Sequence, residues 1–419
     1  MPHSPLAKKE HSDEGCKSMP KAHQETSIAT SQKRFSVLAH AGFVIVGVVN
    51  TFLGAMLPTL STQWRLNDAQ AGRLFAAQFS GAMIGSLLSS LLLKRFGYLR
   101  TLVAGYTGMS VAIACLGLGT AGSAIVSIFF TGMFFGITIP TTNVLVSEMH
   151  PARRAAALNL VNFAWGIGAI AGPPAIVFFS QNGVLLPMLI LASVLILVAL
   201  SLSRCACFTP SESNSTIGRS ESSALQAWMT PYAISTGLLI FLYVGTEASS
   251  YGWVATYAKR LAAPTQTLWM FAQSIFWAGL LSSRALAPLI LRRLSAHKLI
   301  VAGLLTATAG LLLVLMGREL AGVTIGVALA GFGLGPVFPT TFALFSQRFG
   351  SLVAQMAGVV FVIGNLAAAA FPWAVGLLSD WYGGLRPGFM VPVAGAILMI
   401  VLQTAIVAYP RLGWAAKKS

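Results

Sequence analysis

Twelve apolar stretches, each about 20 residues long or longer, place the strongest limit on how this chain of 419 residues can fold. They lie near residues 36–60, 71–93, 98–119, 122–147, 155–178, 184–203, 230–257, 267–291, 297–317, 320–346, 353–379 and 388–409. A helix of about 20 apolar residues crosses roughly 30 Å of hydrocarbon, whereas a transmembrane β-strand is shorter. A helix also satisfies its own backbone hydrogen bonds in lipid. The sequence therefore predicts an all-α integral membrane protein with twelve transmembrane helices.

Basic residues are distributed unevenly between the two sides predicted for the membrane. The chain has 27 Lys and Arg against 11 Asp and Glu, a net charge of +16. With both termini in the cytoplasm, 20 basic residues fall on the cytoplasmic side and 6 on the other side. This is the positive-inside pattern, so the basic charge reports topology and does not predict a nucleic-acid partner. We expect a monomer in a bacterial cytoplasmic (inner) membrane, with the N and C termini cytoplasmic.

A polar segment divides the first six apolar stretches from the last six, and its serines, proline and glycine are typical of a linker. The first 34 residues are polar and lack the apolar core of a signal peptide. The predicted organisation is a disordered cytoplasmic tail (1–34), a six-helix bundle (35–203), a cytoplasmic linker (204–225), a second six-helix bundle (226–411) and a short cytoplasmic tail (412–419).

The two halves repeat one another. FGITIPTTNVLVSE at 135–148 recurs as LGPVFPTTFALFSQ at 334–347, an offset of 199, and Gly81 recurs as Gly279 at an offset of 198. Six intervening helices give both copies the same direction, which is a parallel repeat about an axis along the membrane normal. Two such bundles can rock about a central site, so the repeat favours a transporter over a channel or an enzyme. No phosphate-binding loop, zinc motif or catalytic triad is apparent, and we expect no cofactor.

Glu247 is the only acidic residue in the twelve spans that lies far from any loop. A charge at the centre of a bilayer costs at least about 2.5–3.5 kcal/mol, which makes such a residue a functional candidate. Tyr243 and Tyr251 lie about one helical turn on either side, so one stripe of the helix presents the acid between two phenols. We interpret Glu247 as a carboxylate that takes up and releases a coupling proton. The alternative is a permanently neutral Glu247 that is hydrogen-bonded to the two tyrosines.

Amide, indole and phenol side chains from both halves are the candidates for binding a solute. Amides hydrogen-bond hydroxyl groups and indole faces cover the apolar side of a sugar ring, whereas the spans carry few of the charges that an ionic solute needs. Buried amides are costly unless they are paired, so about half of these polar residues are expected to be structural instead. The candidates are Asn50, Gln78, Asn143, Asn162, Trp165, Tyr243, Tyr251, Gln273, Trp277, Asn365 and Trp373.

Charged residues near the cytoplasmic ends of the spans are candidates for a gate. They are Arg95, Glu148, Arg153 and Arg284. For Glu148 and Arg153 in SEMHPARR, a gate between the halves and a local charge cluster within one loop are both open. Arg284 is the only basic residue within a span, about 12 Å from the cytoplasmic end at 1.5 Å per residue. Glu247 lies nearer the outer half by the same count, so no direct ion pair between Arg284 and Glu247 is expected.

Three segments resemble a known family. KRFGYLR at 94–100, between the second and third spans, is similar to the basic loop motif of the major facilitator superfamily and matches its Arg and Gly. Lys94 stands where that motif has an Asp, and Ser90 where it has a Gly. GITIPTTNVLVSEMHPARRAAALNLVNFAWGIGAIAGP at 136–173 and FLYVGTEASSYGWVATY at 241–257 resemble the fucose-permease-like sugar:proton symporters. The resemblance implies two pseudo-symmetric six-helix bundles, alternating access and a sugar substrate.

These features together predict a secondary active transporter that works by alternating access and takes up a neutral sugar with a coupling cation, a proton. Two alternatives stay open: a proton-driven exporter of amphipathic compounds (multidrug-type), in which the tryptophans line an apolar pocket, and a sodium-coupled sugar symporter. A sensor that binds a solute without moving it would need a large soluble signalling domain, and a tail of 34 residues is too short to hold one.

Overall fold

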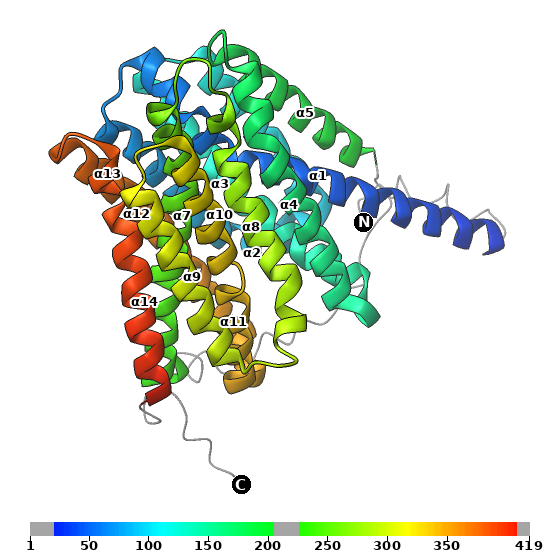
Figure 1. The fold of residues 1–419 in the computed structure, drawn as a ribbon. Coiled ribbons are helices and arrows are strands. Elements are labelled where there is room, and N and C mark those ends of the chain that lie inside the picture. The colour runs from blue at the N-terminus through cyan, green and yellow to red at the C-terminus, as the bar shows by residue number, and fades with distance from the viewer. Residues whose placement is uncertain (1–20, 205–225, 409–419) are drawn as a thin grey trace, which may run out of the picture.

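The computed structural model describes residues 21–204 and 226–408, and the regular elements in these two ranges are helices (Figure 1). The first half contains α1 (Lys21–Trp64), α2 (Asp68–Leu118), α3 (Ala121–Met149), α4 (Arg154–Phe179) and α5 (Leu185–Ser203), which we call the N-bundle. The second half, the C-bundle, contains α7 (Pro231–Leu261), α8 (Ala272–Ile290), α9 (Ala296–Met316), α10 (Leu320–Leu334), α11 (Val337–Phe349), α12 (Val353–Trp381), α13 (Leu385–Gly388) and α14 (Met390–Ala408). Short 3₁₀ helices lie at η1 (Pro151–Arg153), η2 (Leu268–Phe271) and η3 (Gly350–Leu352).

The twelve predicted spans are all present as helices. Ten helical segments in the described part of the chain are long and apolar enough to cross a membrane, with α10 and α11 counted as one segment, Leu320–Phe349. One of the ten, α2, contains two spans because its backbone breaks at Gly97, with φ 73° and ψ 174°. The 19 residues of α8, which include Arg284, supply the twelfth crossing. The predicted all-α membrane fold is therefore confirmed.

Glycines of α2 on either side of the Gly97 break pack against α3, and the α3 residues that they meet run in opposite orders. The pairs are Gly81–Phe129, Gly85–Met133, Gly105–Thr138 and Gly108–Phe134. The first part of α2 therefore runs parallel to α3 and the second part runs antiparallel to it. A φ of 73° favours glycine, so Gly97 allows the chain to reverse between two spans with no longer loop.

The repeat seen in the sequence corresponds to a repeated helix contact. In the N-bundle, Gly136 of α3 packs against the backbone of Ala82 in α2. In the C-bundle, Gly335 at the end of α10 packs against the backbone of Leu280 in α8. Small residues let membrane helices approach closely without a hydrophobic driving force, so both halves use the same device at matched positions.

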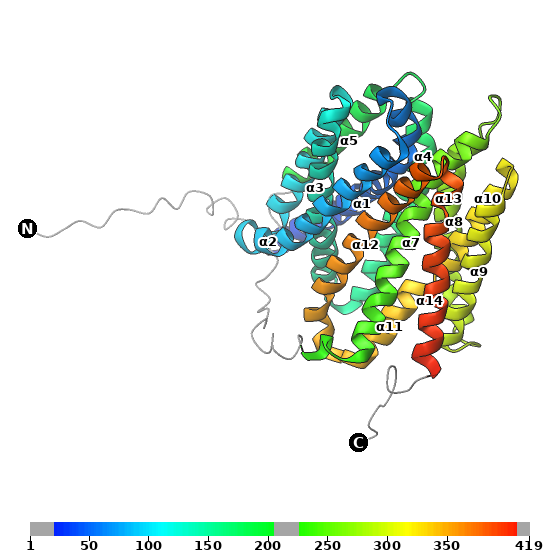
Figure 2. The same cartoon turned by 90° about the vertical axis from the view of Figure 1, so that its left-hand side faces the viewer.

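The two bundles meet at one end of the molecule and diverge at the other. We call the end at which α5 finishes and α7 begins the linker end, and the other the opposite end. Towards the opposite end, Gly72 of α2 packs against Trp373 of α12. In the first turn of α8, Ser274 donates a hydrogen bond of 2.6 Å to the Ile170 carbonyl of α4. In Figure 2, α2 reaches the left of the view, whereas α11 and the end of α14 lie at the bottom. The linker ends of the two bundles thus lie apart.

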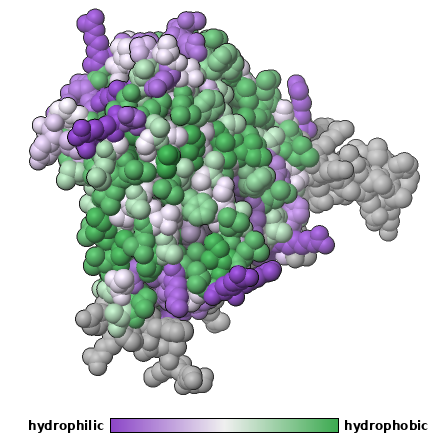
Figure 3. Space-filling view, in the orientation of Figure 1, coloured by the Kyte–Doolittle hydropathy of each residue, from purple (hydrophilic) through white to green (hydrophobic). Residues whose placement is uncertain are grey.

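Hydrophobic side chains cover the outside of the bundles as well as the core. Figure 3 shows hydrophobic residues over most of the visible face, with hydrophilic residues gathered at its top and bottom edges. Large apolar side chains such as Leu118, Phe178 and Met316 are exposed at 71%, 62% and 68%. An apolar belt between polar rims is the surface of a protein whose solvent is lipid.

The start of the first helix differs from the prediction. The sequence predicts a tail without regular structure over 1–34, but α1 begins at Lys21 and continues without a break to Trp64. Helical hydrogen bonds form within the segment itself and need no burial, so a polar sequence can extend an apolar span. Residues 1–20, most of the predicted linker and the predicted second tail lie outside the described residues.

Candidate solute-binding site between the bundles

A charged cluster lies near the middle of α7. The Tyr243 hydroxyl donates a hydrogen bond of 2.8 Å to Oε1 of Glu247, one turn further along the helix. Arg284 of α8 lies 3.6 Å from the same oxygen and donates a hydrogen bond of 3.2 Å to the Tyr243 hydroxyl. Its Nε donates to the Gly335 carbonyl at 3.1 Å. The acid, the phenol and the guanidinium therefore form one connected unit on the C-bundle.

The ion pair between Arg284 and Glu247 corrects the sequence-based expectation of no direct pairing. That expectation measured each depth from the end of its own helix. The 31 residues of α7 span about 46 Å at 1.5 Å per residue, against about 28 Å for the 19 residues of α8, so the two counts have no common origin. The long side chain of Arg284 also reaches away from its own Cα. Arg284 therefore lies in the central cluster, and a part in a gate at the linker end stays a prediction.

Aromatic side chains next to this cluster join the two bundles. The Trp165 ring of α4 meets the Trp277 ring of α8 edge-on, with centroids 5.0 Å apart and an interplanar angle of 84°. Trp277 also lies 5.1 Å from the ring of Tyr251, which hydrogen-bonds Asn50 of α1. Four of the predicted solute-binding residues are thus in one contiguous group that includes helices of both bundles.

Several buried polar atoms of the predicted solute-binding residues have no hydrogen-bond partner in the described part of the chain. Gln273 donates from Nε2 to the Thr51 carbonyl at 3.1 Å, but its Oε1 is unpaired. The other unpaired atoms among the predicted solute-binding residues are Trp277 Nε1, Gln78 Nε2 and Asn143 Oδ1. An unsatisfied buried polar atom costs about 1–3 kcal/mol, so these atoms remain candidates for contact with a polar solute.

Six of the predicted solute-binding residues are not brought into this group by any contact that the structure gives: Gln78, Asn143, Gln273, Asn162, Asn365 and Trp373. The Asn162 amide donates to the Leu158 carbonyl at 2.7 Å and the Asn365 amide donates to the Phe361 carbonyl at 2.9 Å, in each case within the same helix. Trp373 is 40% exposed and packs beside α2 towards the opposite end. Intrahelical hydrogen bonds satisfy these two amides locally, which is the structural role that we expect for part of the set.

The remaining gate candidates lie at the linker end and make local contacts. Glu148 hydrogen-bonds Tyr98, which also belongs to the N-bundle. The guanidinium of Arg95 lies over its neighbour Phe96, 5.4 Å from the ring centroid. Arg153 is exposed. No ion pair between Glu148 and Arg153 is present in the described ranges, so both alternatives for these residues, a gate between the halves and a local charge cluster, stay predictions.

Sequence reasoning missed a connection between the bundles at the opposite end. Arg260 of α7 donates to both carboxylate oxygens of Asp68 in α2, one of them at 2.8 Å, and Ser379 of α12 donates to the same carboxylate. Asp68 is buried, with 9% exposure. Asp68 and Arg260 both lie at helix ends on the same predicted side of the membrane. This shared side is the only sequence feature that could have suggested that the two residues pair. In the same described ranges, no group of three or more His, Cys, Asp or Glu residues is placed to hold a metal ion.

Comparison with known sequences identifies the family. The sequence model of the Major Facilitator Superfamily matches residues 39–372. Bypass of stop codon protein 6 of Saccharomyces cerevisiae is 22% identical over 380 residues, which cover 81% of this chain and 76% of the yeast protein. The 4-hydroxybenzoate transporter PcaK of Acinetobacter baylyi is 29% identical over 123 residues, which cover 28% of this chain and 26% of that transporter.

Solved structures share the fold over nearly the whole chain. A bacterial homologue of the human lysosomal transporter Spinster, in an inward-facing and unoccupied conformation, superposes with a TM-score of 0.74 at 15% identity, covering 92% of this chain and 99% of that one. A D-xylose-proton symporter superposes with a TM-score of 0.68 at 15% identity, covering 87% and 96%. The helical fold, the repeat and the family match agree: the chain belongs to the major facilitator superfamily, and it is a transporter rather than an enzyme.

Proposed function

We propose that this transporter takes up a small neutral polyol, a sugar, together with a proton, and that Glu247 is the group that binds the proton. The observation that carries the proposal is the unit of Glu247, Tyr243 and Arg284, together with buried polar atoms in both bundles that lack partners. The helices that supply these groups belong to both bundles, as alternating access about a central site requires.

The charged cluster suggests how a proton is coupled to movement. Ionised Glu247 attracts Arg284 and accepts a hydrogen bond from Tyr243. Protonation neutralises Glu247 and so removes its electrostatic attraction to Arg284. Arg284 then retains its hydrogen bonds to Tyr243 and Gly335. Protonation biases an equilibrium between two states only if the proton binds them with different affinity. We infer that the state in which the Arg284–Glu247 pair is formed binds the proton less tightly than the state in which it is loosened.

The unpaired polar atoms support a solute rich in hydroxyl groups. Two of them, Trp277 Nε1 and Gln78 Nε2, are donors, and two, Gln273 Oε1 and Asn143 Oδ1, are acceptors. A hydroxyl group both donates and accepts, so a polyol can pair with either kind of atom. The rings of Trp165, Trp277 and Tyr251 supply apolar surface for the sugar ring.

The proposed orientation places the linker end in the cytoplasm. The two bundles lie apart there and are joined at the opposite end, so in this account the structure is the state that releases solute to the inside. A proton and a sugar then enter through the opposite end once the bundles separate.

Uptake into proteoliposomes with an imposed pH gradient tests the coupling. Glu247→Gln is expected to retain exchange of labelled sugar across the membrane and to lose accumulation against its gradient. Glu319→Gln, which removes an exposed acid at the start of α10, serves as the matched control and should retain both activities. Unchanged accumulation in Glu247→Gln contradicts the coupling role. Replacement of sodium by choline separates proton from sodium coupling.

A second candidate function is the transport of an aromatic acid. The observation in its favour is the guanidinium of Arg284 beside the rings of Tyr243 and Phe338, whose centroids lie 5.6 Å apart. The similarity of a 123-residue segment to a 4-hydroxybenzoate transporter points the same way. A thermal-stabilisation screen with monosaccharides, disaccharides, nucleosides, aromatic acids and amphipathic drugs separates these functions, since the transported class is expected to stabilise the purified protein.

A further inference from the structure

A cavity with a volume of about 390 Å³ lies between the bundles at the opposite end. Its walls come from the last turns of α1 and the end of α4 on one side, and from the end of α7 with η2 on the other. Cavities of this size hold small organic molecules. The central cluster contributes none of its lining residues, so the cavity is separate from the proposed solute site.

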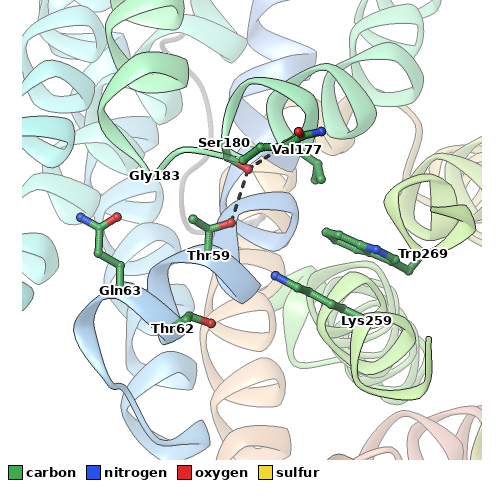
Figure 4. Close-up of a pocket in the computed structure, with 9 residues that line it drawn as sticks. Thr59, Thr62, Gln63, Val177, Ser180, Gly183, Lys259 and Trp269 are labelled. Atoms are coloured by element: carbon green, nitrogen blue, oxygen red, sulfur yellow. Dashed lines mark hydrogen bonds between the residues drawn. The ribbon is translucent and has the colours of Figure 1, made fainter. Parts of the chain in front are cut away.

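Lys259 gives the cavity its charge. It is the only charged residue among those that line the cavity, and its Nζ lies 5.1 Å from the centroid of the Trp269 ring. Neither of the two ion pairs found among the described residues involves Lys259. Figure 4 shows the Lys259 side chain reaching across towards Thr62, with the indole of Trp269 beside it.

The wall that faces Lys259 is polar. Thr59 and Thr62 of α1 and Ser180 after α4 present hydroxyl groups there, and Thr59 and Ser180 lie 3.4 Å apart through their hydroxyl oxygens. Thr62 donates to the Pro58 carbonyl and Ser180 to the Val177 carbonyl, each at 2.9 Å, so their protons are already engaged. Gln63 and Gln181, which also line the cavity, carry side-chain amide groups that can donate to an anionic oxygen. The flat ring of Trp269 gives the other side an apolar face.

We propose that this cavity binds a small organic monocarboxylate with a flat apolar body, its carboxylate on Lys259 and its body against Trp269. One ammonium group matches one negative charge, and a second carboxylate on the same ligand would have no cation among the lining residues. The side-chain amides of Gln63 and Gln181 supply the remaining hydrogen bonds to the carboxylate. The proposal does not depend on which solute the central site carries.

Because the ligand touches both bundles, it also acts on their equilibrium. Movement of the bundles that opens this end separates the α1 wall from Lys259 and Trp269. A ligand that binds one state and not the other shifts the population towards the bound state. The carboxylate therefore holds the opposite end closed, next to the Arg260–Asp68 pair, and slows transport through that end.

Thermal unfolding of the full-length protein in detergent tests the proposal, with benzoate as the probe and benzamide as its neutral counterpart. Benzoate is expected to raise the unfolding temperature and benzamide is not. Lys259→Met should weaken the apparent affinity for benzoate at least tenfold, whereas Lys259→Arg, which keeps the charge, and Lys298→Met, which removes an exposed lysine at the linker end, should retain the shift.

Arg284→Gln separates this cavity from the central cluster, since it leaves the cavity intact and should keep the benzoate shift. A shift that is lost in Arg284→Gln and kept in Lys259→Met places the anion at the central cluster and overturns the proposal. Equal shifts with benzoate and benzamide overturn it as well.

Discussion

Arg260 of α7 holds the carboxylate of Asp68 of α2 in a two-point contact at the opposite end of the molecule. The residues lie 192 positions apart in the chain, one in each bundle, and Ser379 of α12 adds a third hydrogen bond to the same carboxylate. Charge-assisted contacts with two parallel hydrogen bonds are stronger than single ones. This contact therefore fastens the two bundles at the end where they meet.

Arg260→Gln is expected to favour separation of the bundles at that end, because Asp68 loses its cation. The Arg260 side chain is 43% exposed, so solvent screening limits the effect to about 1 kcal/mol, roughly fivefold in the ratio of the two states. Spin labels at Asn182→Cys and Tyr382→Cys, both exposed at this end, report the separation as a larger long-distance population. Arg318→Gln, also exposed, should leave the distances unchanged; an equal change in both variants contradicts a specific role for Arg260.

The spans and their repeat could be predicted from the sequence because both follow from one-dimensional patterns. The length of an apolar stretch is enough to predict a transmembrane helix, whichever helices pack against it. The offset of 198–199 residues can be found by comparing the two halves of the sequence. Gly81 packs against Phe129 and Gly279 against Ala328, which are matched positions of the repeat. Tyr243 and Glu247 were also predictable neighbours, since residues four apart lie on one face of a helix.

Contacts between helices were not predictable in the same way. The Asp68–Arg260 pair requires two bundles to be placed against each other, and no spacing in one sequence encodes that placement. The Arg284–Glu247 pair depends on the relative depth of two helices of different length. For Asn162, the sequence predicts the helical face. It does not predict that the side-chain amide donates to the Leu158 carbonyl of the same helix, at 2.7 Å, instead of contacting the other bundle.

A double-mutant comparison at Glu247 and Arg284 tests whether the carboxyl is ionised. Arg284→Gln leaves a mostly buried carboxylate, 15% exposed, without its cation, which is expected to cost about 1–3 kcal/mol of stability. Replacing Glu247 by Gln as well removes that charge, so the double variant should unfold at a higher temperature than Arg284→Gln alone. If the single variant is as stable as the double one, Glu247 is permanently neutral and the alternative interpretation of the sequence holds.

Trp277→Phe tests whether the unpaired indole nitrogen binds solute. The phenyl ring retains apolar contact with Trp165 and Tyr251, but the Nε1 donor is lost. A lost hydrogen bond of about 1 kcal/mol is expected to raise KM for uptake roughly fivefold, with little change in unfolding temperature. Trp228→Phe is the matched control, because Trp228 also has an unpaired Nε1 but packs on Phe345, away from the cluster. Equal effects of the two substitutions argue against solute contact at Trp277.

Gly136→Ala and Gly335→Ala test whether the repeated helix contact is a condition for folding. A Cβ at Gly136 would meet the backbone of Ala82, and one at Gly335 would meet Ser283 Oγ and the Leu280 carbonyl, so neighbouring backbone has to shift. Overpacking of this kind is expected to cost about 1–3 kcal/mol, seen as a lower unfolding temperature of the purified protein. Gly358→Ala provides the control, because a Cβ there meets open space and alanine favours a helix. A loss in one bundle only would mean that the two halves, although alike in sequence, are not held together by the same contact.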